Sequence, residues 1–359
     1  MLGRRARSWE RRASLRQTPG LEALEARQLM AASIEPIADV TSPQYLGLPV
    51  AVDGGTGRAQ DYTVSSSNPK VGASIARGQF VTMEISHASS GANDPAFTGT
   101  LVFQLFADQT PLTVERISGL INQGFYNGKF LFRIANNFPG PTDYIVQGGS
   151  SDNTASGSIN EPGFPFTDEF VRSLAFTGTG QLAMANSGRD TNGSQFFMTT
   201  GSPRFLDYKH TIFGQLVSGQ ETLEKITQVA LNGSAPVSPV IMSTVTLSNT
   251  NPDGVVLLDT TRAAGGDQAT ITVTATDTQD GSKATRTFKV NVSPDSGANS
   301  RPILSPVSDQ TVGLNQVSVF QLTANNPEPN DPLVYTVQGG KNAAGTAFVP
   351  LTNATGTVD

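Results

Sequence analysis

Apolar and polar residues alternate over short stretches in most of the chain, as in β-strands with one buried face. The clearest pair of stretches is Ala269 to Thr276 and Thr285 to Val292, with Asp280-Gly281 between them. An Asp-Gly pair between two alternating runs predicts a β-hairpin. Shorter runs bounded by Gly and Pro predict further strands at 46–52, 61–65, 71–75, 80–86, 100–105 and 240–247.

Two segments have helical spacing instead. Between Pro111 and Gly124, and again after Gly219, apolar residues recur at the spacing of one helix face. They are Val114, Ile117 and Ile121 in the first segment, and Leu223 and Ile226 in the second. The sequence therefore predicts a mainly β protein that contains two helices.

Length and composition set broad limits. A chain of 359 residues suggests two or three domains. Its 36 Gly and 22 Pro, with only 15% charged residues, favour short strands and many turns. Because the chain has no Cys, disulfides and thiolate metal sites are excluded.

Charge is distributed unevenly. Residues 1–33 contain seven Arg and three Glu, whereas the rest holds 17 basic and 27 acidic residues. An acidic body argues against a nucleic-acid partner. The longest apolar run of the leader, Leu29 to Ala32, is far too short for a membrane span. We therefore expect no nucleic-acid partner and no membrane span.

One long motif suggests a function. It is LAMANSGRDTNGSQFF, from Leu182 to Phe197, and it is accompanied by Phe132-Arg133-Ile134, Val146 to Gly149 and Phe205 to His210. Together these segments resemble the active-site half of a cyclophilin, a peptidyl-prolyl cis/trans isomerase. The resemblance covers roughly residues 79–249. It implies an eight-stranded antiparallel barrel with a helix over each open end.

The chemistry of such an enzyme places few demands on the protein. The X–Pro amide has partial double-bond character and a rotation barrier of about 18–20 kcal/mol. Rotation localises a lone pair on the prolyl nitrogen, so a catalyst needs a donor aimed at that nitrogen and a dry pocket for the ring. It needs no nucleophile, metal or cofactor, and we expect none here. Arg133 is the candidate donor, because a guanidinium is always charged and carries five N–H groups.

The resemblance assigns further residues to the site. The catalytic set is Arg133, Gln147, Phe197 and His210. The substrate-binding set is Tyr144, Ile145, Ala185, Asn186, Gln195, Phe205 and Leu206. Gln147 is expected to orient Arg133 or the substrate carbonyl. His87 is expected in a loop, without a role.

The chain departs from the family pattern at three places. The segment between Arg133 and Gln147 is about six residues longer than usual, which could reshape one rim of the groove. Tyr144-Ile145 replaces a Phe-Met pair, and Phe205 replaces a Trp. Phe lacks the indole N–H donor, but the apolar surface remains.

The flanking segments resemble parts of bacterial Ig-like or cadherin-like repeats. Residues 34–78 look like opening strands and 250–294 like closing strands of one sandwich, into which 79–249 would be inserted. The alternative is an array of separate, incomplete sandwiches. Residues 295–359 look like a second, incomplete repeat. Within the leader of residues 1–33, the segment LEALEARQLMAAS resembles an N-terminal element of planctomycete surface or exported proteins, which implies a targeting segment. The alternative is a disordered basic tail.

Two polar stretches in these flanks could bind calcium weakly. They are 277–281 and 325–331, which are rich in oxygen-bearing side chains. An ordinary polar turn is the simpler interpretation.

Three functions are compatible with the sequence. The first is an exported or envelope-facing isomerase that acts on proline-containing polypeptides and assists their folding. The second is a non-catalytic module that binds proline peptides within an adhesive surface protein. The third is a structural surface protein whose groove is vestigial. Arg133 together with Phe197 favours the enzyme.

Overall fold

The computed structural model describes residues 32–55, 57–135, 144–159, 161–295, 303–304 and 324–325. The predictions for the leader, for the insert that follows Ala135 and for nearly all of the second repeat lie outside these residues.

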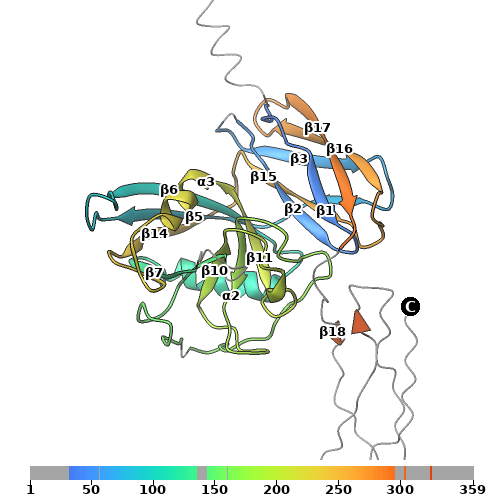
Figure 1. Cartoon of the computed structure of the whole chain (residues 1–359). Coiled ribbons are helices and arrows are strands. Elements are labelled where there is room, and N and C mark those ends of the chain that lie inside the picture. Colours follow the sequence, from blue (N-terminus) through green and yellow to red (C-terminus); the bar gives the residue numbers. More distant parts are fainter. Residues whose placement is uncertain are drawn as a thin grey trace, which may run out of the picture.

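Eight strands form a closed antiparallel barrel in the order β10-β8-β7-β14-β5-β6-β11-β9 (Figure 1). The strands are β5 (Phe80–His87), β6 (Phe97–Leu105), β7 (Lys129–Ala135), β8 (Ile145–Gly148), β9 (Gln181–Met184), β10 (Phe196–Thr199), β11 (Ile212–Ser218) and β14 (Val240–Ser248). The predicted mainly β fold with an eight-stranded barrel is therefore confirmed. Closure leaves this sheet without an exposed edge.

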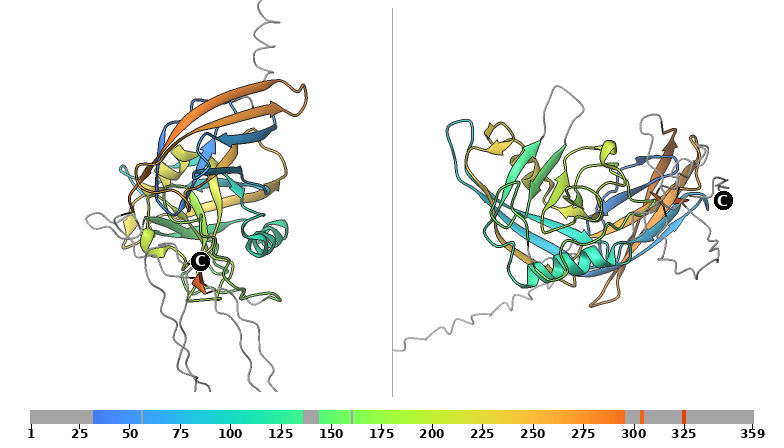
Figure 2. Two further views of the ribbon diagram at one scale, coloured as in Figure 1. Left: turned by 90° about the vertical axis from the view of Figure 1, so that its right-hand side faces the viewer. Right: turned by 90° about the horizontal axis from the view of Figure 1, so that it is seen from below.

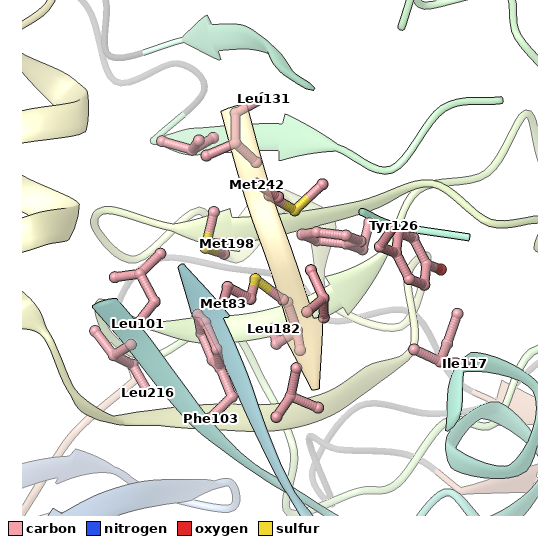
Figure 3. Packing of buried hydrophobic residues seen from close by; sticks show 14 of the residues in the cluster. Met83, Leu101, Phe103, Ile117, Tyr126, Leu131, Leu182, Met198, Leu216 and Met242 are labelled. Atoms are coloured by element: carbon pink, nitrogen blue, oxygen red, sulfur yellow. The ribbon is translucent and has the colours of Figure 1, made fainter. Parts of the chain in front are cut away.

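The interior of the barrel is filled by apolar side chains from all eight strands. Met83, Phe103, Leu182, Met198 and Met242 meet there, and each is 3% exposed or less (Figure 3). In β5, β6, β9 and β10 alternate residues point inward, as the period of two along a strand requires. Irregularities in the register interrupt this alternation in β7, β11 and β14. The buried residues of the cluster to which these five belong, among them Val146, Met184 and Phe196, are called the barrel core below.

Two α-helices in the described part of the chain add to the barrel core. They are α2 (Pro111–Asn122) and α3 (Gln220–Thr227). Both were predicted, and the apolar positions named above are their buried faces. Pro occupies the first turn of α2, where its missing N–H costs nothing. Gly124 (φ +72°) follows α2 and Gly219 (φ +96°) precedes α3, both in the left-handed region that favours glycine.

Two further sheets lie beside the barrel and form what is called the two-sheet unit below (Figure 1). One has the order β1-β17-β16-β3 and the other the order β2-β15-β4. The strands are β1 (Val40–Pro43), β2 (Gly47–Val52), β3 (Gln60–Ser66), β4 (Gly72–Ile75), β15 (Gly254–Asp259), β16 (Gln268–Asp277) and β17 (Lys283–Ser293). Both sheets contribute to one buried cluster, which includes Val52, Val256, Ile271 and Phe288.

The two-sheet unit is discontinuous in sequence. Strands β1 to β4 precede the barrel and β15 to β17 follow it, yet β15 pairs with both β2 and β4, and β16 pairs with β3. The predicted hairpin of β16 and β17 is present, with Gly281 (φ +71°) in its turn. The assignment of this unit to the Ig-like repeats and the domain boundaries stay predictions.

Short elements complete the described chain. They are the 3₁₀ helix η1 (Arg204–Leu206), the pair β12 (Leu231–Asn232) with β13 (Ala235–Pro236), and the pair β18 (Ile303–Leu304) with β19 (Ala324–Asn325).

Candidate active site

Four neighbouring strands align the central residues of the site. Arg133 on β7 lies opposite Gln147 on β8, which lies opposite Phe197 on β10, which lies opposite Ala183 on β9. Residues directly opposite each other in antiparallel strands point to the same face of the sheet. Since Val146, Phe196 and Leu182 belong to the barrel core, this row points outward. The site is therefore built on the outer wall of the barrel.

A chain of hydrogen bonds holds the polar part of this row. An Nη1–H of Arg133 donates to Oε1 of Gln147 at 3.2 Å, and Nε2 of Gln147 donates to Oε1 of Gln195 at 2.9 Å. Nε2 of Gln195 in turn donates to the carbonyl of Gly157 at 2.7 Å. The three hydrogen bonds therefore run in one direction, from Arg133 through the side-chain amides of Gln147 and Gln195 to Gly157. This order places the Gln147 oxygen toward Arg133, so it restricts the orientation of the guanidinium.

The apolar part of the site is a cluster on the outer wall, called the outer-face cluster below. Phe197 is 2% exposed, and its ring stacks on that of Phe176 with 5.6 Å between centroids. The buried members are Ala76, Phe106, Ala135, Ile145, Leu174, Phe176, Ala183, Phe197, Ile212, Val255 and Leu257. Ala185 and Leu206 are partly buried against it. This cluster gives the outer wall of the barrel an apolar, largely buried surface beside the polar row.

His210 stands at the edge of this surface. Its ring meets that of Phe197 edge-on, with 5.3 Å between centroids and an angle of 83° between planes. Its Nδ1 lies 2.9 Å from the Met184 carbonyl, and a carbonyl only accepts, so Nδ1 carries the hydrogen. Burial lowers the pKa of His210, an effect that the hydrogen bond to Met184 opposes. The imidazole is therefore neutral near pH 7, with Nε2 as an acceptor.

A groove of about 480 Å³ lies beside the polar row. Gln147, Ala185, Asn186 and Gln195 line it, together with the segments 155–159 and 164–165. The Asn186 amide donates to the Lys209 carbonyl at 2.8 Å, which ties the groove wall to the loop before β11. The predicted wall residues are thus together on one groove.

Two predicted residues lie at the periphery. Phe205, on η1, is 44% exposed, and Tyr144 is half-buried beside Gly201. Among the rings of the described residues, those that pack against Phe197 belong to Phe176 and His210. Leu206, which follows Phe205, turns inward to the outer-face cluster.

The expectation that His87 lies in a loop was wrong. It is the last residue of β5 and is 4% exposed, with Nε2 2.9 Å from Oδ1 of Asp94 and Nδ1 3.3 Å from the Pro239 carbonyl. The strand thus ends one residue beyond its predicted end, and the buried ring has a hydrogen-bond partner at each nitrogen, as buried polar groups usually do.

Sequence reasoning also missed Phe176 and the pair Arg204 and Asp207. Phe176 lies outside any strand, in a stretch without a periodic pattern, so nothing local indicates that it supports Phe197. Nε of Arg204 donates to Asp207 at 2.5 Å, three residues along the chain. That spacing is the one local signal that could have suggested the pair.

Metal ligands are not gathered anywhere in the described ranges: they contain no group of three or more His, Asp or Glu side chains suited to an ion. In the turn at 277–281, Asp277 forms an ion pair with Arg58 at 3.1 Å and accepts hydrogen bonds from the backbone N–H groups of Gln279 and Asp280. Calcium binding at 277–281 stays a prediction, and no group of three ligands supports it among the described residues. The other predicted stretch, 325–331, lies largely outside the described residues.

Comparisons with known proteins agree with this geometry. Residues 85–247 match the family model described as "Cyclophilin type peptidyl-prolyl cis-trans isomerase/CLD". The chain is 39% identical over 143 residues to "Peptidyl-prolyl cis-trans isomerase-like 1" of Mus musculus, a match that covers 40% of this chain and 82% of that one. The protein of the same description from Aspergillus oryzae is 39% identical over 153 residues, covering 42% and 91%.

A crystal structure of a Cryptosporidium parvum cyclophilin type peptidyl-prolyl cis-trans isomerase aligns with 47% of this chain and 97% of that one, at 29% identity and a TM-score of 0.40. Membership of the family is shown by the sequence relatives, which are 39% identical to this chain over most of their own length. The chain belongs to the cyclophilin-type peptidyl-prolyl cis-trans isomerases, and the prediction of an isomerase of this family is confirmed.

Among the helices that the structure describes, none combines the length and the apolar character needed to cross a membrane.

Proposed function

We propose that this protein catalyses cis/trans isomerisation of X–Pro bonds with Arg133 as the donor to the prolyl nitrogen. The observation that carries the proposal is the juxtaposition of two surfaces. Arg133, oriented by Gln147, stands in the same row as Phe197, so a proline ring seated on Phe197 would bring its nitrogen near the guanidinium.

Each group then has a distinct task in the reaction. Phe197, Ile145 and Leu206 exclude water from the ring, which removes hydrogen-bonding partners that stabilise the planar amide. As the amide twists, the lone pair localises on nitrogen and becomes a better acceptor for Arg133. This hydrogen bond is stronger in the twisted state than in either planar state, and only such differential stabilisation accelerates rotation. No covalent intermediate and no net proton transfer are involved.

The rim residues hold the polypeptide around the reacting bond. Gln195 and Gln147 share a hydrogen bond and line the groove with Ala185 and Asn186, so they present amide and backbone groups to the residues next to the proline. Neutral His210 closes the edge of the ring surface and adds no charge that would compete with Arg133. Tyr144 and Phe205 supply apolar contacts at the periphery.

The proposed role is assistance to the folding of proline-containing proteins outside the cytoplasm, with the flanking sheets as an Ig-like spacer or adhesion unit. The basic leader and its resemblance to a targeting element motivate the location. A fusion of residues 1–33 to a reporter enzyme tests it, and a reporter that stays in the cytoplasm would contradict this part of the proposal.

The decisive experiment is exchange spectroscopy of a short Ala-Pro-Phe peptide with the full chain. We expect acceleration by the wild type and a loss of about 100-fold in kcat/KM for Arg133→Ala, the usual cost of removing one preorganised donor. Arg286→Ala, at an exposed Arg of β17, is the matched control and should change nothing. Peptide binding without acceleration would instead identify a non-catalytic binding module.

A further inference from the structure

The outer-face cluster does not end at the barrel. Val255 and Leu257, on β15 of the two-sheet unit, are 1% and 8% exposed and belong to the same cluster as Phe197 and Ile212. Strand β11, which begins with Ile212, contacts both β2 and β15 (Figures 1 and 2). The apolar surface behind the proline pocket is therefore continuous with the two-sheet unit.

The segment 170–177 lies between the two parts. On one side, Phe176 stacks on Phe197. On the other, Thr177 Oγ1 donates to the Gly47 carbonyl at 3.2 Å, and a Cβ at position 47 would meet the Ser173 carbonyl oxygen at 2.2 Å. Only glycine permits so close an approach, so β2 holds this segment against the barrel.

A second contact joins the same parts behind the 3₁₀ helix η1. Leu46, just before β2, is 1% exposed and forms a small buried cluster with Ala175 and Tyr208. The Tyr208 hydroxyl donates to the Arg172 carbonyl at 2.8 Å. The loop that follows η1 is thus anchored on the start of β2.

The third contact is ionic. Arg204, the first residue of η1, donates to Asp207 through Nε and to Asp295 through its two terminal nitrogens, at 3.5 and 3.1 Å. Asp295 follows the end of β17, the last strand of the two-sheet unit. The side chains of Arg204 and Asp295 are 18% and 12% exposed, so water screens this pair only in part.

Asp207 connects this ion pair to the pocket floor. Its Oδ1 accepts the backbone N–H of Phe176 at 2.7 Å, while its Oδ2 faces Arg204. Burial raises the pKa of the Asp207 carboxyl, and Arg204 opposes that shift. A path of direct contacts therefore runs from Asp295 through Arg204 and Asp207 to Phe176, which stacks on Phe197.

We infer that the two-sheet unit forms the back wall of the proline pocket, and that Asp295 is a positioning residue for substrate binding. The inference rests on the function proposed above. Asp295 is not a catalytic residue, because it contacts neither the substrate nor Arg133. It acts through Arg204, which it fixes at the start of η1, the helix that carries Phe205 and Leu206. Through Asp207 it also fixes Phe176, the ring that stacks on Phe197. Loss of this restraint would loosen the ring surface and leave the donor intact.

The test is steady-state isomerisation by the full chain with Asp295→Asn, which keeps the shape and removes the charge. We expect KM to rise about threefold to tenfold with kcat within about twofold, because small displacements of binding groups are costly while the donor is unchanged. Asp295→Glu should recover most of the loss. The matched control is Asp267→Asn, which removes the charge of an ion pair with Lys70 inside the two-sheet unit.

A second variant addresses the apolar contact. Leu46→Ala should raise KM in the same way, and the ring resonances of Phe197 and His210 should shift in both Leu46→Ala and Asp295→Asn but not in Asp267→Asn. Circular dichroism would establish that each variant is folded at the assay temperature.

The outcomes separate the two proposals. Unchanged KM and unchanged ring resonances in folded Asp295→Asn and Leu46→Ala would overturn the inference, whatever the fate of Arg133→Ala. An equal fall of kcat and kcat/KM in Asp295→Asn would also overturn it, since that pattern indicates lost catalysis rather than lost binding. Normal activity of Arg133→Ala would overturn the proposed function instead.

Discussion

The two faces of β8, β9 and β10 use the same strands for different purposes. Facing inward, Val146, Leu182, Met184, Phe196 and Met198 are apolar without exception and fill the barrel core. Facing outward, apolar residues such as Ile145 and Phe197 alternate with the hydrogen-bonded Gln147. The inner face has one task, which is to exclude water and fill volume. The outer face must also present oriented polar groups.

Adjacent residues illustrate the difference best. Phe196 and Phe197 are the same residue type, stand on the same strand and are both 2% exposed. Phe196 packs edge-on against Tyr126 in the barrel core, whereas Phe197 contacts Phe176 and His210 on the outer face. Burial alone therefore does not distinguish a core residue from a candidate site residue, and the following predictions test that distinction.

The largest effect is expected from a cavity in the barrel core. Phe196→Ala should lower the free energy of unfolding by about 3–5 kcal/mol, because the closed barrel cannot collapse around the lost ring. Urea denaturation of the full chain measures this, with Ser243→Ala on the exposed side of β14 as the control. A cost below about 1 kcal/mol would mean that the barrel interior is not close-packed.

An intermediate effect separates the two rings. Phe197→Leu and Phe196→Leu keep an apolar side chain and should each cost about 1–2 kcal/mol of stability. Phe197→Leu should in addition raise KM about tenfold, equivalent to roughly 1.4 kcal/mol of lost contact with the proline ring. Phe196→Leu should leave KM unchanged. Isomerase kinetics at a temperature where both variants are folded would decide, and equal KM values would remove the functional distinction between the faces.

The smallest effect concerns the protonation of His210. Its pKa is lowered by burial, so the folded state disfavours the charged ring. The unfolded chain then binds the proton at higher pH than the folded chain, near pH 6.5. The contribution of neutral His210 to the free energy of unfolding is therefore complete above pH 6.5. It is lost as the pH falls from 6.5 toward the lowered pKa of His210 in the folded state.

An NMR titration of the His210 ring checks this directly. The midpoint of the titration should lie below 6.5 in the folded protein, and in urea it should rise to the reference pKa of about 6.5. His210→Gln should flatten the decline of stability between neutral and mildly acidic pH. A midpoint at or above 6.5 in the folded protein would contradict the burial argument.

Much of the fold was predictable because its signals are local. Alternation predicted the strands of the hairpin β16 and β17 and both strands β5 and β6, and helical spacing with flanking Gly predicted α2 and α3. These patterns depend on residues two to four positions apart, which the sequence displays directly. The limit of such reasoning is seen at His87, whose burial depends on Asp94 and Pro239 and not on the polarity of its own neighbours.

The sequence by itself also indicated the family and was enough to predict candidate site residues, because the motifs around Arg133 and Phe197 are contiguous segments. Only the tertiary structure decided how those segments share one wall and what stands behind it. Asp295 lies 91 residues from Arg204, and Leu257 lies 60 residues from Phe197. Contacts over such separations are set by sheet pairing and close packing across elements, which leave no periodic or local trace in the chain.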